Sequence, residues 1–298
     1  MDLSTTPSLA RSAEIRARLV TPVVLLFILA GLAIATILFA VTRDQDRTAI
    51  EQSETVVAAL LKRSHGDMAA LAKDYSYWND AVRNLVVALD PTWADENVGV
   101  YLGRTYKLAA TLVVSGEDRV TYAAADRARA DPAQMAAALP ALAPILERAR
   151  RRIDADEPSP SFGTIKLGDR IHFVGASRIA PERPGSLVTP DPRAVLVLLC
   201  SLEDNLLAFM RDGLAYADVR VEPAVPGGLD GSLALGEELA PFAYAVWRPR
   251  LPGDELRVVL LPMIAVVVAV MAGLVALLLT RIDRTIGEVR GWPARADQ

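Results

Sequence analysis

The residues with the most chemical character in this sequence lie at 74–80, Asp-Tyr-Ser-Tyr-Trp-Asn-Asp, and at 90–97, Asp-Pro-Thr-Trp-Ala-Asp-Glu-Asn. Aromatic faces together with a few fixed polar groups are what a small-ligand pocket needs, because burial supplies affinity and hydrogen bonds supply orientation. A histidine that alternates with Ile171 and Phe173 in an expected strand adds a further polar side chain. These patterns predict a site for a small ligand. The candidate ligand-binding residues are Tyr75, Tyr77, Trp78, Asn79, Asp80, Trp93, Asn97 and His172.

A structural interpretation of the same residues stays open. Tyr75 and Trp78 lie three residues apart on an apolar stripe, so they also suit the core face of a helix. Asp80 then caps a turn or pairs locally, while Trp93 and Asn97 brace the turn that follows. Tyr77, Asn79 and Asp80 project away from the stripe in either case.

The sequence contains no catalytic motif. It has no Gly-x-Ser-x-Gly elbow, no His-Glu-x-x-His pair and no phosphate-cradling loop. One cysteine excludes an internal disulfide, and with two histidines a zinc site would have to be completed by carboxylates. We therefore expect no catalytic residue, no cofactor and no metal, and no enzymatic activity in this chain. The formal net charge of −4 argues against a nucleic-acid partner, which requires a basic face.

Other reactive side chains are expected in ordinary environments. The arginines at 148, 150, 151 and 152 suggest a solvated helix face, with contact to anionic lipid or an acidic ligand as the alternative. His65, beside a glycine, is expected to be solvated, and the acids Asp44 and Asp46 to lie on an exposed charged stretch. Cys200 ends an apolar strand and is expected to act as a small buried hydrophobe, with redox sensing as the alternative.

Two apolar runs, 19–42 and 258–280, contain no Asp, Glu, Lys, Arg or His. Each makes a helix of roughly 35 Å, long enough to cross a hydrocarbon core of about 30 Å. The first run is too long for a signal peptide, and its exit at 39–43 is a poor cleavage site, so we expect an uncleaved anchor. Arginines flank both runs on their outer sides, and short positively charged flanks stay in the cytoplasm.

These features predict a multi-pass protein of a bacterial inner membrane with both termini in the cytoplasm. The expected segments are a cytoplasmic arm at 1–18, a transmembrane helix at 19–42, a periplasmic domain at 43–257, a second transmembrane helix at 258–280 and a short cytoplasmic tail at 281–298. Small residues recur every fourth position at Ala265, Ala269 and Gly273, a spacing that lets helices approach closely in lipid. This stripe suggests a homodimer, although alanine and glycine are also simply common in membrane helices.

The exported segment begins with a helical apolar rhythm and then changes to a strand rhythm. A long helix is expected from 43 to about 89, with one stripe formed by Met68, Leu71, Tyr75, Trp78, Val82, Leu85 and Leu89. Further helices are expected at 91–102, 133–153 and 201–210, and strands at 108–114, 119–125, 162–167, 170–179, 194–200, 218–222 and 242–247. The expected fold is α+β, a long N-terminal helix and an antiparallel sheet with helices on one face, as in PAS-like or Cache-like sensors.

The stretch 74–80, followed by Pro-x-Trp-x-x-Glu-Asn at 91–97, resembles the fourth type of the CHASE family of extracellular sensors. In that family a strand hairpin and a Trp-x-Pro-x-x-Pro-Gly segment come later, just before the second membrane helix. This chain has that segment at 247–253. The resemblance covers most of residues 45–258, and its motifs occur in the expected order.

The resemblance implies sensing. Such domains usually precede diguanylate cyclase, phosphodiesterase or histidine-kinase modules, whereas only eighteen residues follow Thr280 here. The expected function is a transmembrane receptor for an extracytoplasmic small ligand that signals to a cytoplasmic partner. One alternative is the regulatory N-terminal half of a longer membrane enzyme, and another is a membrane scaffold that recruits a partner. A scaffold should tolerate substitution of Trp78 and Asp80, and a sensor should not.

Overall fold

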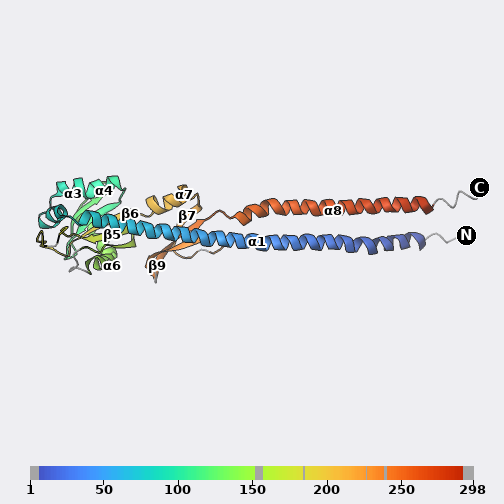
Figure 1. Cartoon of the computed structure of the whole chain (residues 1–298), viewed down its shortest axis with the longest axis horizontal. Coiled ribbons are helices and arrows are strands. Elements are labelled where there is room, and N and C mark those ends of the chain that lie inside the picture. The colour runs from blue at the N-terminus through green and yellow to red at the C-terminus, as the bar shows by residue number, and fades with distance from the viewer. Residues whose placement is uncertain (1–6, 152–156, 184, 226, 238–239, 291–298) are drawn as a thin grey trace, which may run out of the picture. The chain divides into compact units, whose positions relative to one another are not determined.

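Two long helices dominate the computed structural model, which describes residues 7–151, 157–183, 185–225, 227–237 and 240–290. Helix α1 spans Pro7–Ser76 and helix α8 spans Pro252–Arg290 (Figure 1). Both contain windows long and apolar enough to cross a membrane, with mean hydropathies of 2.6 and 2.9. The chain divides into two compact units, a helical unit of residues 1–49 with 251–298 and a globular unit, Ile50–Arg250. Parts of the expected cytoplasmic arm and tail, at 1–6 and 291–298, lie outside the described residues.

Inside the helical unit, α1 and α8 are joined by a buried carboxylate. Asp46 is fully buried, which corrects the expected exposed stretch. Its carboxylate accepts a hydrogen bond from the backbone N–H of Gly253 at 2.8 Å and forms an ion pair with the Arg257 guanidinium. The Arg257 guanidinium also lies 5.5 Å from the ring centre of Phe39. A Cβ at position 253 would lie 2.1 Å from the carbonyl oxygen of Thr42, so only glycine permits this approach.

The globular unit is built on a six-stranded antiparallel sheet in the order β3-β2-β1-β6-β5-β4. Its strands are β1 (Ala110–Val114), β2 (Val120–Ala125), β3 (Ala128–Arg129), β4 (Ser161–Leu167), β5 (Arg170–Arg178) and β6 (Val195–Ser201). The two expected hairpins and the expected buried strand near 194–200 are confirmed. The α+β class is confirmed with them.

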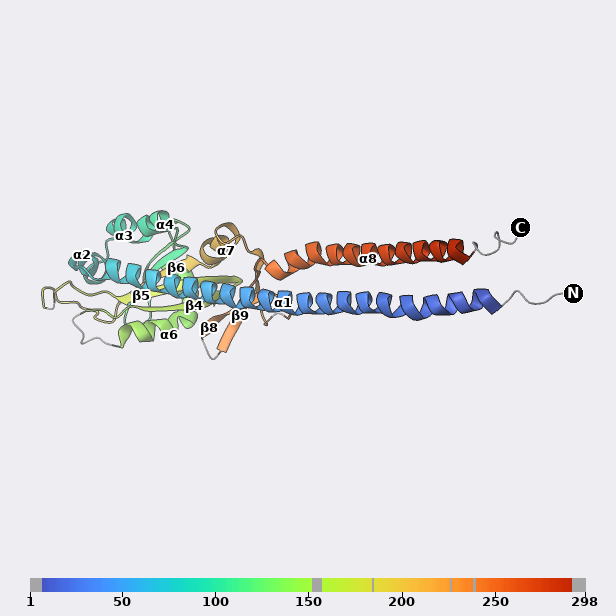
Figure 2. The same cartoon turned by 45° about the vertical axis from the view of Figure 1, so that its right-hand side comes forward.

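Helices cover both faces of this sheet, not one face as expected from the sequence. Side chains alternate along β5, so that Phe173 joins the core beneath α1 while Val174 joins a second core beneath α6, Leu139–Arg150. Figure 2 shows α1 and α6 on opposite sides of the strands. The apolar residues of β5 and β6 fill consecutive positions, as in strands buried on both faces. Helix α1 approaches so closely that a Cβ at Gly175 would lie 2.1 Å from the carbonyl oxygen of Met68.

A second, three-stranded sheet has the order β7-β9-β8. Strands β7 (Ala217–Glu222) and β9 (Ala240–Arg248) were expected, and β8 (Gly231–Glu237) was not. The fully buried Trp247 of β9 donates its indole N–H to Ser53 of α1 at 3.0 Å. Ser232 of β8 donates its backbone N–H to the Glu54 carboxylate of α1 at 3.0 Å. The second sheet is therefore also held by α1.

The long helix ends at Ser76, and the expectation that it continues to 89 is wrong. The buried Ser76 hydroxyl donates to the Ser177 hydroxyl at 2.8 Å, and its carbonyl accepts from the N–H of Ala180 at 3.1 Å. Tyr77 then pairs with Ala180 as an isolated bridge. These bonds to β5 and its extension replace helical bonds, so the chain restarts as α2 (Asn79–Ala81) and a π-helical turn, η1 (Val82–Val87).

Three other expected helices are each divided in the structure. The span 91–102 forms α3 (Pro91–Asn97), capped by Asp90, and α4 (Gly99–Thr105). The span 133–153 forms α5 (Pro132–Met135), a 3₁₀ turn η2 (Ala136–Ala138) and α6, because Pro140 suits the first turn of a new helix. The span 201–210 forms η3 (Glu203–Leu207) and α7 (Ala208–Asp212), and the Ser201 hydroxyl accepts the N–H of Asp204 as expected of a cap.

Candidate functional site

The break after α1 brings three predicted site residues into one aromatic cluster. The Trp78 and Trp93 rings lie 5.3 Å apart, and the Trp78 indole N–H donates to the carbonyl of Tyr75 at 3.1 Å. The Tyr75 ring lies 6.3 Å from Tyr101 and 6.4 Å from Tyr106, both from α4 and the turn after it. Burial and the two neighbouring phenols raise the pKa of Tyr75. Tyr101 and Tyr106 were not among the predicted site residues, because only the fold places α4 beside the end of α1.

Tyr77 and Asn79 face a different segment, the loop after β5. The Tyr77 hydroxyl donates to the carbonyl of Glu182 at 2.9 Å. The Ser186 hydroxyl lies 3.3 Å from the Asn79 side-chain oxygen, to which it donates. These two predicted residues therefore bind the protein's own loop.

The remaining polar candidates near the break also have local partners. Asp80 forms an exposed ion pair with Arg83 at 2.9 Å. The Asn97 amide donates to the carbonyl of Trp93 at 2.9 Å and so braces α3. Both arrangements correspond to the structural interpretation.

His172 lies far from the aromatic cluster. It sits near the start of β5, whereas the break contacts the far end at Ser177, five residues further along, which is roughly 16 Å in a strand. The side chain is buried, and its Nδ1 has no hydrogen-bond partner within the described part of the chain. Burial, followed by the charge of Arg170, lowers the His172 pKa. The structure therefore does not assemble all eight candidates into one site.

A polar network ties α3 to the sheet beside the cluster. Asp95 accepts a hydrogen bond from the Tyr122 hydroxyl at 2.7 Å and from Arg129 at 2.6 Å. Burial opposes ionisation of Asp95, but these two donors lower its pKa overall. A Cβ at Gly99 would lie 1.8 Å from the Tyr122 hydroxyl oxygen, so glycine leaves room for the ring. The segment 91–97 that carries the family resemblance is thus fixed by packing and by this network.

A cavity of 540 Å³ opens between the two sheets, away from the aromatic cluster. Its walls come from the β4–β5 hairpin, the turn after β6, and strands β7 and β9. The lining residues are Lys166, Asp169, Arg170, Ile171, Ser201, Leu202, Glu203, Asp204, Leu207, Val221, Glu222, Pro223, Phe242 and Ala243. None of the eight predicted site residues is among them. Nothing local in the sequence marks this cavity, because its four walls are far apart along the chain.

A more open cavity of 690 Å³ lies along β4 and includes His65. The expectation that His65 is solvated is wrong. Its ring stacks on Phe162 at 5.2 Å, meets the edge of Phe173 at 5.4 Å, and shares a 2.9 Å hydrogen bond with the Thr164 hydroxyl. Burial lowers the pKa of His65 below 6.5.

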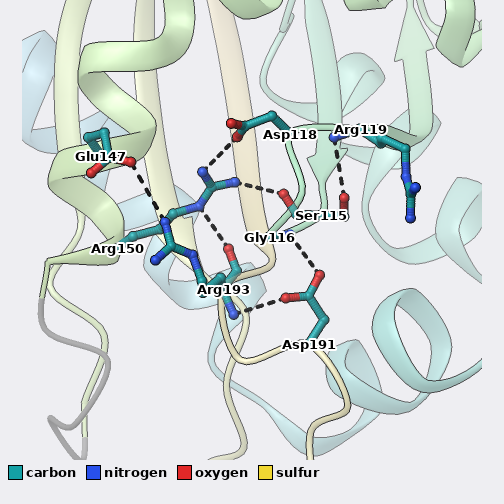
Figure 3. Close-up of polar contacts among 8 residues, drawn as sticks. All are labelled: Ser115, Gly116, Asp118, Arg119, Glu147, Arg150, Asp191 and Arg193. Atoms are coloured by element: carbon teal, nitrogen blue, oxygen red, sulfur yellow. Dashed lines mark hydrogen bonds and ion pairs between the residues drawn. The ribbon is translucent and has the colours of Figure 1, made fainter.

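The expected solvated arginine face is also corrected by the structure. Arg150 is buried, with its guanidinium donating to the carbonyls of Ser115 (2.7 Å) and Arg193 (3.0 Å) and to Asp118 (2.7 Å) (Figure 3). Asp191 accepts the N–H of Gly116 at 2.7 Å in the same network. Arg150 therefore links the end of α6 by hydrogen bonds to the β1–β2 turn and to the residues just before β6.

The neighbouring arginines differ from Arg150. Arg148 donates to Ser161 and to the carbonyl of Phe162, whereas Arg151 is exposed and Arg152 lies outside the described residues. Cys200 is buried as expected, and burial raises its thiol pKa. Among the residues that the structure describes, no group of three or more His, Cys, Asp or Glu side chains is placed to hold a metal ion.

Comparisons with known proteins assign the family. The model of the CHASE4 domain matches residues 60–222, more than half of the chain. Among solved structures, the periplasmic domain of LuxQ from Vibrio cholerae is similar, with 15% sequence identity and a TM-score of 0.35 over 68% of this chain and 95% of that one. No curated protein matches the sequence. The motifs at 74–80 and 91–97 thus indicated the right family, and the chain belongs to the CHASE4 family of sensory domains found in signalling proteins.

Proposed function

We propose that this protein is a bacterial inner-membrane receptor that senses a small extracytoplasmic ligand and passes a conformational signal to a cytoplasmic output. One observation carries the proposal. A CHASE4 domain at 60–222 lies in the sequence between the apolar runs 19–42 and 258–280, which belong to two helices long and apolar enough to cross a membrane. A sensory domain in that position is separated from the cytoplasm, so its signal must travel through the helices.

The flanking charges support the orientation. Arginines at 11, 16 and 18 precede the first apolar run, and arginines at 281, 284, 290 and 295 follow the second. We propose that 1–18 and 281–298 are cytoplasmic, that 19–42 and 258–280 span the membrane, and that 43–257 is periplasmic. A homodimer and a cytoplasmic signalling partner complete the proposal.

The continuity of α1 supports transmission. This single helix contains an apolar window and also contributes Met68 and Ala72 to the core of the globular unit. A ligand signals only if it binds two packings of the domain with different affinities. Contact between ligand and the aromatic residues at 75–80 stays a prediction, as the structure gives those residues packing roles.

Topology is tested by labelling single cysteines in spheroplasts of the native host with a membrane-impermeant maleimide. Cys200 is replaced by alanine, and one cysteine is introduced at Val188, whose side chain is 86% exposed, or at Ala294 in the tail. We expect labelling at 188 in intact spheroplasts and at 294 only after lysis. Labelling at 294 and protection at 188 before lysis would overturn the proposed orientation.

The output is tested by immunoblotting native membranes with an antibody against the globular unit. A band near 32.1 kDa indicates that a separate protein reads the short tail. A much larger band indicates that this chain is the regulatory half of a longer enzyme, such as a diguanylate cyclase, phosphodiesterase or histidine kinase.

A further inference from the structure

The cavity between the two sheets combines an apolar floor with a charged rim. Ile171, Leu202, Leu207 and Ala243 are buried and form the floor. The charged residues at the rim are exposed or half-buried. A volume of 540 Å³ lies within the range of roughly 300–1,000 Å³ typical of small-ligand sites.

Two of the rim carboxylates are already neutralised by the protein. Glu203 pairs with Arg211 at 2.5 Å, and Glu222 pairs with Arg220 at 2.6 Å. Both arginines lie outside the cavity lining. These carboxylates are therefore poor candidates for binding a ligand cation.

Four rim charges have no such ion pair. Within the described residues, Lys166, Asp169, Arg170 and Asp204 form no salt bridge with another side chain. Lys166, Asp169 and Arg170 belong to the β4–β5 hairpin, and Asp204 follows β6. Around its apolar floor the cavity thus presents two cations and two carboxylates that no salt bridge engages in the described parts of the chain.

We infer that this cavity binds a small zwitterion with an apolar side chain, of the α-amino acid class; the inference rests on the proposed sensory function. The ligand carboxylate pairs with Arg170 and Lys166, and the ligand ammonium pairs with Asp204 or Asp169. A simple anion would leave the carboxylates facing it unpaired, and a simple amine would leave the cations unpaired. The side chain is buried on the apolar floor, and this burial adds to the affinity that the charge-assisted hydrogen bonds at the rim supply.

The location of the cavity gives such a ligand a means of signalling. Its walls belong to both sheets, and α1 packs against both, through Met68 on one and through the Ser53–Trp247 bond on the other. A ligand that contacts both sheets binds most tightly at one particular distance between them. Binding therefore favours the packing of the domain that has this distance.

The test uses the full chain in detergent micelles or nanodiscs and measures thermal unfolding and calorimetric binding. The probes are the common L-amino acids, and L-leucine is compared with 4-methylpentanoate, which lacks the ammonium, and 3-methylbutylamine, which lacks the carboxylate. We expect an apolar L-amino acid to bind and to raise the unfolding temperature, and each half-charged analogue to bind at least about tenfold more weakly.

Variants assign the two ends of the ligand. Arg170→Gln should weaken amino-acid binding by about tenfold or more, but should leave the amine unchanged. Asp204→Asn should weaken amino-acid binding similarly and should leave the carboxylate analogue unchanged. Exposed residues elsewhere, in Arg151→Gln and Asp212→Asn, serve as matched controls that should bind as the wild type does.

Three outcomes overturn the inference. They are equal binding of leucine and one analogue, amino-acid binding that both variants retain, and no binding of any L-amino acid at about 10 mM, a concentration that detects even millimolar affinity. None of them touches the receptor proposal, which the cysteine-labelling experiment decides separately.

Discussion

Replacing the buried Arg150 with methionine should destabilise the globular unit by about 2–3 kcal/mol. Methionine keeps much of the apolar stem but removes every hydrogen bond of the guanidinium. The side chain of Arg150 is only 2% exposed, and its partners come from the β1–β2 turn and from the residues before β6. The variant therefore removes the Arg150 bonds between the end of α6 and two other parts of the fold, and leaves the 3.7 Å ion pair of Glu147 with Arg193 in place.

The magnitude follows from the three partners taken separately. The carbonyl of Arg193 loses its side-chain donor, which costs about 1–2 kcal/mol when an acceptor is left partly buried. The carbonyl of Ser115 keeps a bond from the N–H of Asp118 at 3.1 Å, so its loss is smaller, about 0.5–1 kcal/mol. Asp118 is 65% exposed and returns to water, so the ion pair contributes less than about 1 kcal/mol.

The assay is urea unfolding of the detergent-solubilised full chain, followed by tryptophan fluorescence and checked for two-state behaviour with a second probe. With a slope near 2 kcal/mol/M, the expected loss lowers the midpoint by about 1–1.5 M. The adjacent, exposed Arg151→Met is the matched control and should change stability by less than about 0.5 kcal/mol. Equal midpoints for the two variants would refute the argument that burial of Arg150 makes its bonds stabilising.

Three further perturbations test other parts of the structure. Burial lowers the His65 pKa below 6.5, so the unfolded state binds the proton more readily, and the stability that neutral His65 provides is complete above pH 6.5 and declines below it. In His65→Phe the urea midpoint should therefore change less between pH 7.5 and pH 5 than in the wild type. An equal change in the two proteins would contradict this. Gly175→Ala places a Cβ 2.1 Å from the Met68 carbonyl oxygen and should cost several kcal/mol or prevent folding, whereas Gly66→Ala, with open space around it, should not destabilise; equal proteolytic resistance would count against the close approach of α1. Gly253→Ala should separate α1 from α8 and lower disulfide cross-linking between cysteines introduced at Gly31 and Val268, and full cross-linking would show that the contact with Thr42 is dispensable.

The sequence predicted most strands, because β1, β5 and β6 are short apolar runs bounded by turn residues, a signal carried by neighbouring positions in the chain. Strand β8 was missed because its sequence, Gly-Ser-Leu-Ala-Leu-Gly-Glu, begins and nearly ends on glycine. In the structure, the Trp247 indole occupies the space that a side chain at position 231 would need. A Cβ on Gly231 would lie 2.7 Å from the nearest indole atom. A long-range partner of that kind leaves no local pattern.

The end of α1 shows the same limit. Residues 68–89 keep a helical apolar rhythm, and that rhythm correctly marks Val82 and Leu85 as core. It cannot show that the Ser76 hydroxyl and carbonyl bind Ser177 and Ala180, a hundred residues later. The candidate site was predicted on the basis of residue types, and Tyr75, Trp78 and Trp93 did gather. Asp80 and Asn97 pair with neighbours in their own helical segments. Tyr77 and Asn79 bind a loop whose position only the fold determines.

Those partners bear on where a ligand can act. A hydroxyl that already donates to the protein's own backbone, as Tyr77 does to Glu182, must give up that bond before it can donate to a ligand, and its net gain is correspondingly small. The charges of Lys166, Arg170 and Asp204 incur no such loss, because no ion pair within the described chain has to be broken first. The cavity walls also belong to two sheets that α1 holds at different points, near Met68 and near Ser53. A small change in the spacing of the sheets therefore bears directly on the helix proposed to enter the membrane, whereas a ligand confined to the aromatic cluster would contact only the end of that helix.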